Sequence, residues 1–248
     1  MKKIYNPVIL LMLFTVFNSC SDQLPAEQTA AFMYGGDFSI LKKMVDSGGV
    51  YKIDGVEKNA LEIFTGNGYN YARLRIFHTP NMAGPTCNSL EYTIALAKEV
   101  KAAGMKILLN FHYSDTWADP GHQIKPQAWE GLAFEVLVDS VYQYSKSVIR
   151  SMKNANVLPD MVQIGNEVSP GMIWPEGKIE KDSLSDWDSF STLLKAGISG
   201  VKDAYGSIEV PIMIHTDKSG DVNATGNFFT KIAEHGVIFD LIGLSYYP

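Results

Sequence analysis

The chain has 248 residues and a formal net charge of −6, with 46% hydrophobic and 19% charged residues. This length is enough to bury one large hydrophobic core or two modest ones. The acidic balance implies no basic face, so the composition argues against nucleic acid as a partner.

Residues 1–20 have the pattern of an export signal. Two lysines form a basic start, and the apolar run at residues 8–17 is too short to span a bilayer as a mature helix. A small residue precedes Cys20, as in bacterial lipoprotein signals, so we expect cleavage before Cys20 and attachment of lipid to it. The alternative is an ordinary secretory peptide and a secreted protein. Residues 21–31 are predicted to be a flexible tether, and Cys87 is the only other cysteine, so a lipidated Cys20 leaves no disulfide within the chain.

From residue 32 onward, expected strands alternate with expected helices. We predict strands at residues 33–39, 71–77, 105–115, 161–167, 210–217 and 240–248. We predict helices at residues 39–49, 60–70 and 89–104, within 128–155, and near 187–205 and 227–236. The pair Asp54-Gly55 tolerates positive φ and predicts a small hairpin. This alternation indicates a parallel sheet with helices outside it.

Polar side chains gather where the predicted strands end. They are Asp37, Arg75, His112, Asp115, Glu167, His215, Asp217 and Tyr246. In a TIM barrel the carboxyl ends of all strands lie on one face, and the active site lies there. The first strand is not followed by the glycine-rich phosphate motif of a dinucleotide-binding fold. We therefore predict an α/β fold, a (β/α)8 TIM barrel over residues 32–248. About six of its eight strand–helix units are expected, with the chain truncated after the sixth strand.

Asn166 and Glu167 stand side by side at the end of the apolar strand that begins at Met161. A carboxyl group in that position can act as a general acid near neutral pH. The neighbouring amide can bind a sugar hydroxyl. A solvated strand end is the other interpretation of this pair, and the position at the expected fourth barrel strand favours chemistry.

Residues 110–123 form a dense polar loop after a buried strand. The loop carries two histidines, two aspartates and a tryptophan: His112, Asp115, Trp117, Asp119 and His122. A divalent metal site is one interpretation, but the spacing matches no standard zinc motif. A sugar subsite with Trp117 as stacking surface is the other, and Trp174 on the loop after Glu167 favours such a groove. We assign no metal ligand and expect no required cofactor; a structural Ca²⁺ is left open.

Six segments point to a known family: YARLRIF, LNFHYSDTWADPGHQ, QIGNE, MIWPEG, IMIH and LIGLSYYP. In this order they closely resemble the endo-β-1,4-galactanases of glycoside hydrolase family 53, from about residue 34 to residue 248. The resemblance implies a clan A (β/α)8 barrel that retains anomeric configuration. It also implies endo-hydrolysis of β-1,4-galactosidic bonds in galactan or type I arabinogalactan.

The resemblance also assigns roles to residues. Glu167 is the general acid/base, and Asn166 binds the sugar 2-hydroxyl. Arg73 supports the nucleophile, and so does Tyr246, which we prefer to Tyr247. The groove would be lined by Asp37, Arg75, His112, Asp115, Trp117, Asp119, Trp174, His215 and Asp217.

A retaining mechanism requires a second carboxylate about 5 Å from the first. In the clan this nucleophile is a glutamate at the end of strand seven, and the resemblance finds no counterpart for it here. We therefore expect the chain of 248 residues to be inactive as it stands.

Three other functions remain open from the sequence. The first is another clan A endo-glycanase, such as a mannanase or glucanase. The second is a metal-dependent hydrolase built on His112, Asp115, Asp119 and His122. The third is a lipid-anchored glycan-binding protein without catalysis. The expected partners are the polysaccharide and, through the lipid, a membrane at the cell surface or in the periplasm; we expect a monomer.

Overall fold

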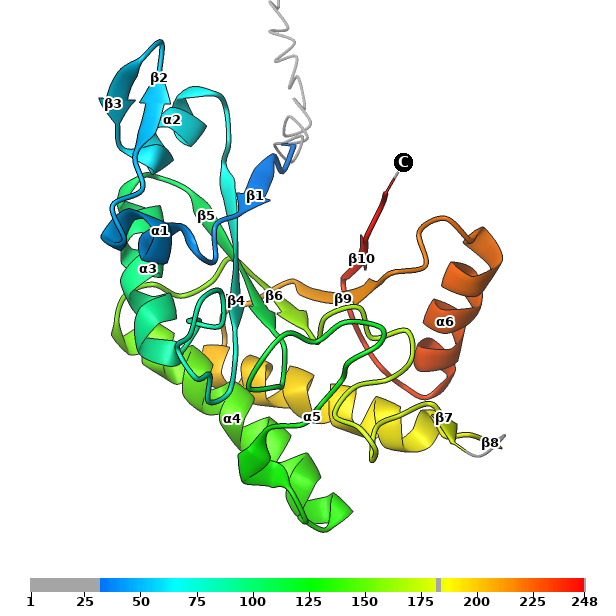
Figure 1. Ribbon diagram of the computed structural model, residues 1–248. Helices are drawn as coiled ribbons and strands as arrows, with labels where there is room; N and C mark the ends of the chain where they lie inside the picture. Colours follow the sequence, from blue (N-terminus) through cyan, green and yellow to red (C-terminus); the bar gives the residue numbers. More distant parts are fainter. Residues whose placement is uncertain (1–31, 182–183, 248) are drawn as a thin grey trace, which may run out of the picture. The chain divides into compact units, whose positions relative to one another are not determined.

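Six parallel strands form one curled sheet in the order β1-β4-β5-β6-β9-β10 (Figure 1). The strands are β1 (Gly35–Asp37), β4 (Tyr71–Ile76), β5 (Lys106–Phe111), β6 (Met161–Ile164), β9 (Ile212–Thr216) and β10 (Leu241–Leu244). This is the parallel, helix-covered sheet that the sequence predicts, and it has the curvature of a partial TIM barrel.

The structure is a computed structural model that describes residues 32–181 and 184–247. The folded unit starts at Met33. The predicted signal segment, the tether and the lipidated Cys20 lie outside the described residues. No helix in the described ranges is both long and apolar enough to cross a membrane.

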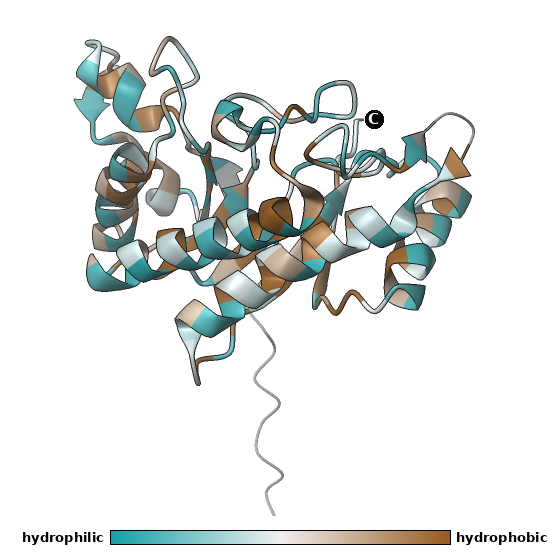
Figure 2. Cartoon of the chain, turned by 90° about the horizontal axis from the view of Figure 1, so that it is seen from below, coloured by the Kyte–Doolittle hydropathy of each residue, from teal (hydrophilic) through white to brown (hydrophobic). Residues whose placement is uncertain are grey.

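Helices follow the strands on the outer side of the sheet (Figure 1). They are α1 (Leu41–Asp46), α2 (Ala60–Gly66), α3 (Leu90–Ala102), α4 (Phe134–Asn154), α5 (Trp187–Tyr205) and α6 (Val222–Glu234), with a 3-10 turn, η1, at Gln127–Trp129. Figure 2 shows hydrophobic and hydrophilic residues alternating along these helices, as expected when one face packs on a sheet. Helices α4 and α5 lie so close that a Cβ on Gly200 would be 2.3 Å from the carbonyl oxygen of Tyr142.

Local signals explain where most elements begin and turn. The side chain of Ser89 accepts a hydrogen bond from the main-chain N–H of Tyr92 and caps the start of α3. The predicted hairpin forms as β2 (Tyr51–Ile53) and β3 (Val56–Lys58), with positive φ at Asp54 and Gly55. Another hairpin, β7 (Glu180–Lys181) with β8 (Leu184–Ser185), was not predicted.

The prediction for the start of the last helix is wrong by about one and a half turns. We expected a helix near residues 227–236, but α6 begins at Val222. The carboxylate of Asp221 accepts from the main-chain N–H of Ala224 at 2.9 Å and caps the helix there. A capping aspartate inside a polar loop explains the earlier start.

The two faces of the sheet differ in chemistry. On β4, Leu74 and Ile76 belong to the hydrophobic core beneath the helices, while Arg73 and Arg75 lie on the opposite, inner face. Because side chains alternate along a strand, Arg73 and Arg75 are each followed by an apolar residue on the outer face. The inner face therefore concentrates charge at the carboxyl ends of the strands, where the sequence predicts the site.

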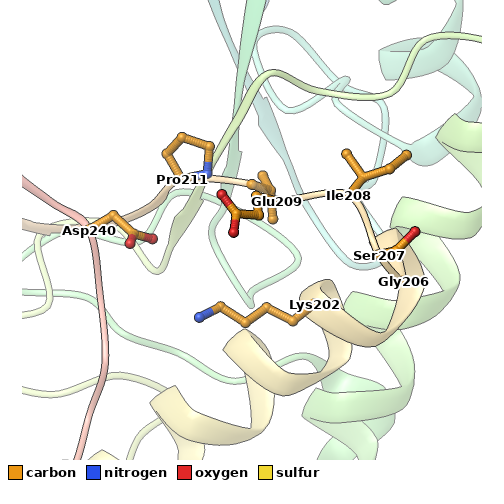
Figure 3. Close-up of a pocket in the computed structure, with 8 residues that line it drawn as sticks. Lys202, Gly206, Ser207, Ile208, Glu209, Pro211 and Asp240 are labelled. Carbon is orange, nitrogen blue, oxygen red and sulfur yellow. The ribbon is translucent and has the colours of Figure 1, made fainter.

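A cavity of about 430 Å³ lies at the other end of the sheet (Figure 3). It is lined by Lys202, Gly206, Ser207, Ile208, Glu209, Val210, Pro211 and Asp240. Pro211 and Asp240 precede β9 and β10, so this cavity is at the amino-terminal ends of the strands. The carboxylate of Asp240 accepts a hydrogen bond from the main-chain N–H of Ile212 at 2.8 Å. Asp240 therefore links the beginnings of β9 and β10. Barrel active sites occupy the opposite face.

Candidate active site

Glu167 lies on a sharp turn directly after β6. Its φ is 50° and that of Gly165 is 75°, both in the left-handed region. A Cβ on Gly165 would lie 2.4 Å from a methyl carbon of Val168, so glycine is required there. A non-glycine residue in this conformation carries strain, and such strain is concentrated at functional sites. The turn brings Glu167 to the carboxyl edge of the sheet.

The side chain of Glu167 is held by the end of β10. The hydroxyl of Ser245 donates to Oε1 of Glu167 and lies 3.0 Å from Nε2 of His215. The main-chain N–H of Glu167 donates to Nδ1 of His215 at 3.3 Å. Three residues from three strand ends therefore meet. His215 lies at the carboxyl end of its strand, as predicted, and its place beside Glu167 is shown by the structure.

Sequence reasoning missed Ser245. Its partners become visible only in the structure, where Gly243 faces Met213 and His215 and the residue two positions later shares that face. We instead chose its neighbour Tyr246, which is 71% exposed. Its role as a support of the nucleophile stays a prediction.

Arg73 joins three strands on the inner face. Its Nη1 lies 2.8 Å from Oδ2 of Asp37, and its Nη2 donates to Oδ1 of Asn166 at 2.7 Å. Its Nε donates to Oε1 of Gln163 at 3.3 Å. The planar guanidinium thus orients the amide beside Glu167. Gln163 was not among the predicted residues, although it is the single polar side chain in the strand MVQI.

The polar loop at residues 110–123 packs against this pair. The Asn166 amide donates to the carbonyl oxygen of Ala118 at 2.8 Å. The Gln123 amide donates to the carbonyl oxygen of Asn166 at 2.9 Å. The orientation of Asn166 is therefore set by the loop as well as by Arg73.

Trp117 stands over Arg75 at the edge of the site. The guanidinium carbon of Arg75 is 3.8 Å from the ring centroid of Trp117, and Arg75 also lies 3.5 Å from Asp37. Trp117 is 38% exposed, so part of its ring is open to solvent. The guanidinium of Arg75 covers one part of the indole ring, and the part open to solvent is suited to stacking on a sugar ring.

His112 is buried next to these residues. Its Nδ1 accepts from the main-chain N–H of Ala118 at 2.9 Å, so its hydrogen is on Nε2. Within the described part of the chain that Nε2 has no hydrogen-bond partner. Burial, with the charges of Arg73 and Arg75, holds the pKa of His112 well below its usual value. His112 is therefore a neutral donor.

Other predicted groove residues mainly hold loops in place. Asp115 accepts from the main-chain N–H groups of Thr79 and Gln127, at 2.8 and 2.9 Å. Asp119 closes a tight turn through His122, with Oδ1 and Nδ1 3.0 Å apart. Both carboxylates therefore have hydrogen-bond partners within the protein and need no ligand to satisfy them.

Trp174 and Asp217 belong to the loops that follow β6 and β9. The indole N–H of Trp174 donates to the carbonyl oxygen of Pro170, and the Lys178 ammonium lies 4.8 Å from the ring centroid. Asp217 accepts from Ser169 and lies 3.1 Å from Nζ of Lys218. Partial burial opposes these contacts, but the hydrogen bonds lower the pKa of Asp217.

The residues of the metal alternative do not come together. His112 is buried with its Nδ1 occupied, Asp115 binds main chain, and Asp119 pairs with His122. Over residues 32–181 and 184–247, no group of three or more His, Cys, Asp or Glu residues is arranged to hold a metal ion. The geometry gives this alternative no support.

Acidification should destabilise the fold through His215. Burial, and next the charge of Arg73, lowers the pKa of His215 to about 4, against an opposing effect of Asp217. The unfolded chain therefore binds a proton below about pH 6.5 that the folded chain binds only near pH 4. The stabilisation is complete above pH 6.5 and is lost as the pH falls. Between pH 7 and pH 5 this residue should lower the free energy of unfolding by about 2 kcal/mol.

Urea unfolding at both pH values measures this effect. The variant His215→Gln should remove most of the difference that His215 causes. The matched variant His122→Gln, at an exposed position, should keep it. An identical pH dependence in His215→Gln and the unsubstituted protein would contradict the prediction.

Comparison with known proteins adds to this geometry. The model of glycosyl hydrolase family 53 matches residues 33–248. An "Uncharacterized protein in bgaB 5'region" of Niallia circulans is 44% identical over 222 residues, covering 88% of this chain and 59% of the relative. The "Arabinogalactan endo-beta-1,4-galactanase A" of Aspergillus niger is 38% identical over 231 residues, covering 91% of this chain and 64% of the relative.

Two solved structures have the same fold. A structure described as "Ignisphaera aggregans GH53 catalytic domain" has a TM-score of 0.81 and 38% identity, over 88% of this chain and 60% of that chain. A structure of fungal beta-1,4-galactanases has a TM-score of 0.81 and 34% identity, over 88% and 65%. The chain therefore spans about three fifths to two thirds of the length of these relatives.

Proposed function

This chain belongs to glycosyl hydrolase family 53, and on that basis we propose that it acts in endo-hydrolysis of β-1,4-galactosidic bonds in galactan or type I arabinogalactan. The observation that carries the proposal is the setting of Glu167. This carboxyl group is placed by a strained turn, held by Ser245, and flanked by the Arg73–Asn166 pair. Relatives named as galactanases support the choice of substrate.

The proposed reaction is a double displacement. Glu167 protonates the glycosidic oxygen while a second carboxylate about 5 Å away attacks the anomeric carbon. Glu167 then removes a proton from the water that releases the glycosyl-enzyme. Asn166, held by Arg73, would bind the sugar 2-hydroxyl. The attacking carboxylate is expected, from the resemblance, on a seventh strand, and the sheet of the described residues has six.

The groove residues would bind neighbouring sugars. We assign the open face of Trp117 to stacking on a sugar ring. His112 is buried with its ring centroid 6.1 Å from that of Trp117, and it would support the indole. Asp37 and Arg75 would hold Arg73 and Trp117 in place, as their contacts suggest. Trp174 and Asp217 would extend the groove on the side of β6 and β9.

Hydrolysis of a panel of polysaccharides tests the substrate class. The protein produced from its complete gene should cleave β-1,4-galactan, with an early fall in viscosity and release of oligosaccharides. It should leave β-mannan and β-glucan intact and keep its activity in the presence of a chelator. Cleavage of mannan or glucan in place of galactan would favour another clan A glycanase. Loss of activity in chelator would reopen the metal-dependent alternative.

We also propose a membrane location through a lipid on Cys20. The support is the basic start, the short apolar run and the small residue before the cysteine. In a bacterial host the full chain should enter the membrane fraction after radiolabelled fatty acid is incorporated. The variant Cys20→Ala should lose both the label and the membrane association. A labelled Cys20→Ala protein, or an unlabelled parent protein, would contradict the anchor.

A further inference from the structure

Ser245 touches the carboxyl group of Glu167, yet the proposed reaction gives it no chemical task. It follows β10 and is partly buried. Its hydroxyl contacts two groups at once, Oε1 of Glu167 and Nε2 of His215. A hydroxyl has a single hydrogen to donate, so the two contacts must differ in direction.

The partners of His215 decide that direction. The main-chain N–H of Glu167 points at Nδ1 of His215, so Nδ1 is an acceptor and carries no hydrogen. A neutral imidazole has one N–H, which is then on Nε2 and is directed at Oγ of Ser245. Because Oγ accepts from His215, the hydrogen of Ser245 goes to Oε1 of Glu167.

The protonation state of His215 keeps this direction constant. Burial lowers the pKa of His215 to about 4, so the ring is neutral well above that pH. A protonated ring would repel the N–H of Glu167 from Nδ1 and break the first link of the chain. Near neutral pH the hydrogen bonds therefore run from the Glu167 main chain, through His215 and Ser245, to the Glu167 carboxyl group.

We propose, resting on the function proposed above, that Ser245 is a positioning residue that gives the two oxygens of Glu167 different tasks. Oε1 accepts from Ser245 throughout, and Oε2 carries the catalytic proton. In the first step the Oε2–H bond breaks and the proton joins the leaving oxygen as the glycosidic C–O bond breaks. The attacking carboxylate forms the new bond to the anomeric carbon. Glu167 is left as a carboxylate that Ser245 stabilises. In the second step Oε2 takes a proton from water as the water oxygen bonds to the anomeric carbon and the bond to the attacking carboxylate breaks.

A comparison of leaving groups separates this role from a purely structural one. Galactan has a poor leaving group that needs protonation, whereas a dinitrophenyl β-galactobioside releases a phenolate that needs none. We expect Ser245→Ala to lower kcat/KM on galactan about 10- to 100-fold, as for loss of one charge-assisted hydrogen bond. On the dinitrophenyl substrate kcat/KM should change by less than about 3-fold, because the proton transfer is not required.

Two variants serve as controls in the protein produced from the complete gene. Ser245→Thr keeps the hydroxyl and should restore most of the activity on galactan. Ser140→Ala removes a hydroxyl on α4 that donates to the carbonyl oxygen of Val136, far along the chain from the site residues, and should leave hydrolysis of both substrates unaffected. Equal losses of Ser245→Ala on both substrates, or no loss on galactan, would overturn the proposal.

Nitrogen NMR of the unsubstituted protein gives a second measurement, which does not depend on the variant folding. His215 should show its hydrogen on Nε2, with Nδ1 unprotonated, near pH 7. A hydrogen on Nδ1 would reverse the chain of hydrogen bonds and overturn the proposal whatever the kinetics. An unsubstituted enzyme that does not cleave galactan would refute the proposed function and this inference with it. Galactan cleavage with equal losses would refute this inference alone.

Discussion

Replacing Glu167 with glutamine should lower kcat/KM on galactan by about 10²- to 10⁴-fold, the range for loss of a general acid/base. The amide keeps the shape of the side chain but has no proton to deliver and cannot take one from water. It can still accept from Ser245 through its carbonyl oxygen. Substrate binding and the fold should therefore survive. Hydrolysis rates, with affinity electrophoresis in galactan gels, measure the two effects separately.

The control for this variant is Glu130→Gln. Glu130 is an exposed carboxylate at the end of η1, so the same chemical change there should leave hydrolysis unaffected. The unsubstituted protein could bind galactan without hydrolysing it, and Glu167→Gln could bind galactan equally well. That pair of results would show a glycan-binding protein without catalysis. Full hydrolysis of galactan by Glu167→Gln would show that Glu167 is not the general acid/base.

Replacing Arg73 with alanine should reduce both activity and stability. Asp37 loses its closest cation, and Asn166 and Gln163 each lose a donor. Asn166 then loses the shortest hydrogen bond to its Oδ1 and keeps there only the 3.4 Å contacts from Asn110 and Gln163. We therefore expect kcat/KM on galactan to fall about 10²- to 10³-fold, the scale found for loss of one positioned donor at an active site. The partners left without Arg73 should cost about 1–3 kcal/mol of stability.

Two further variants sharpen this test. Arg73→Lys keeps the charge but cannot form three directed hydrogen bonds from one plane, so it should recover stability better than activity. Arg150→Ala removes an exposed arginine near the end of α4 and should change neither. Hydrolysis assays and urea unfolding provide the measurements. Activity equal to that of the unsubstituted enzyme in Arg73→Ala would show that Asn166 needs no support from Arg73.

The sequence predicted that the polar residues at the strand ends lie together at one edge of the parallel sheet. The structure confirms this placement for most of them. Arg73, Asn166, Glu167 and His215 meet at the carboxyl ends of their strands. This outcome was predictable because strand periodicity and the position of each polar residue are local properties of the sequence. The family follows from the same segments, since their order along the chain is visible without coordinates.

Other assignments could not be made from local patterns. Asp115 looks like a ligand in a polar loop, but its hydrogen-bond partners are the main-chain N–H groups of Thr79 and Gln127, which folding brings close. The partner of a carboxylate depends on which loops pass within about 3 Å of it, and that is a property of the chain path. The importance of Ser245 was missed for the same reason, because its two partners are 30 and 78 positions away in the sequence.

The sequence alone determined the strand–helix order, the polar strand ends and the choice of Glu167 as the candidate acid, because these depend on periodicity and residue type within short segments. Tertiary structure alone decided which oxygen of Glu167 is held, which tautomer His215 adopts and which carboxylates support loops. These properties depend on hydrogen-bond direction between groups far apart in the chain, and direction exists only once the strands have been brought side by side.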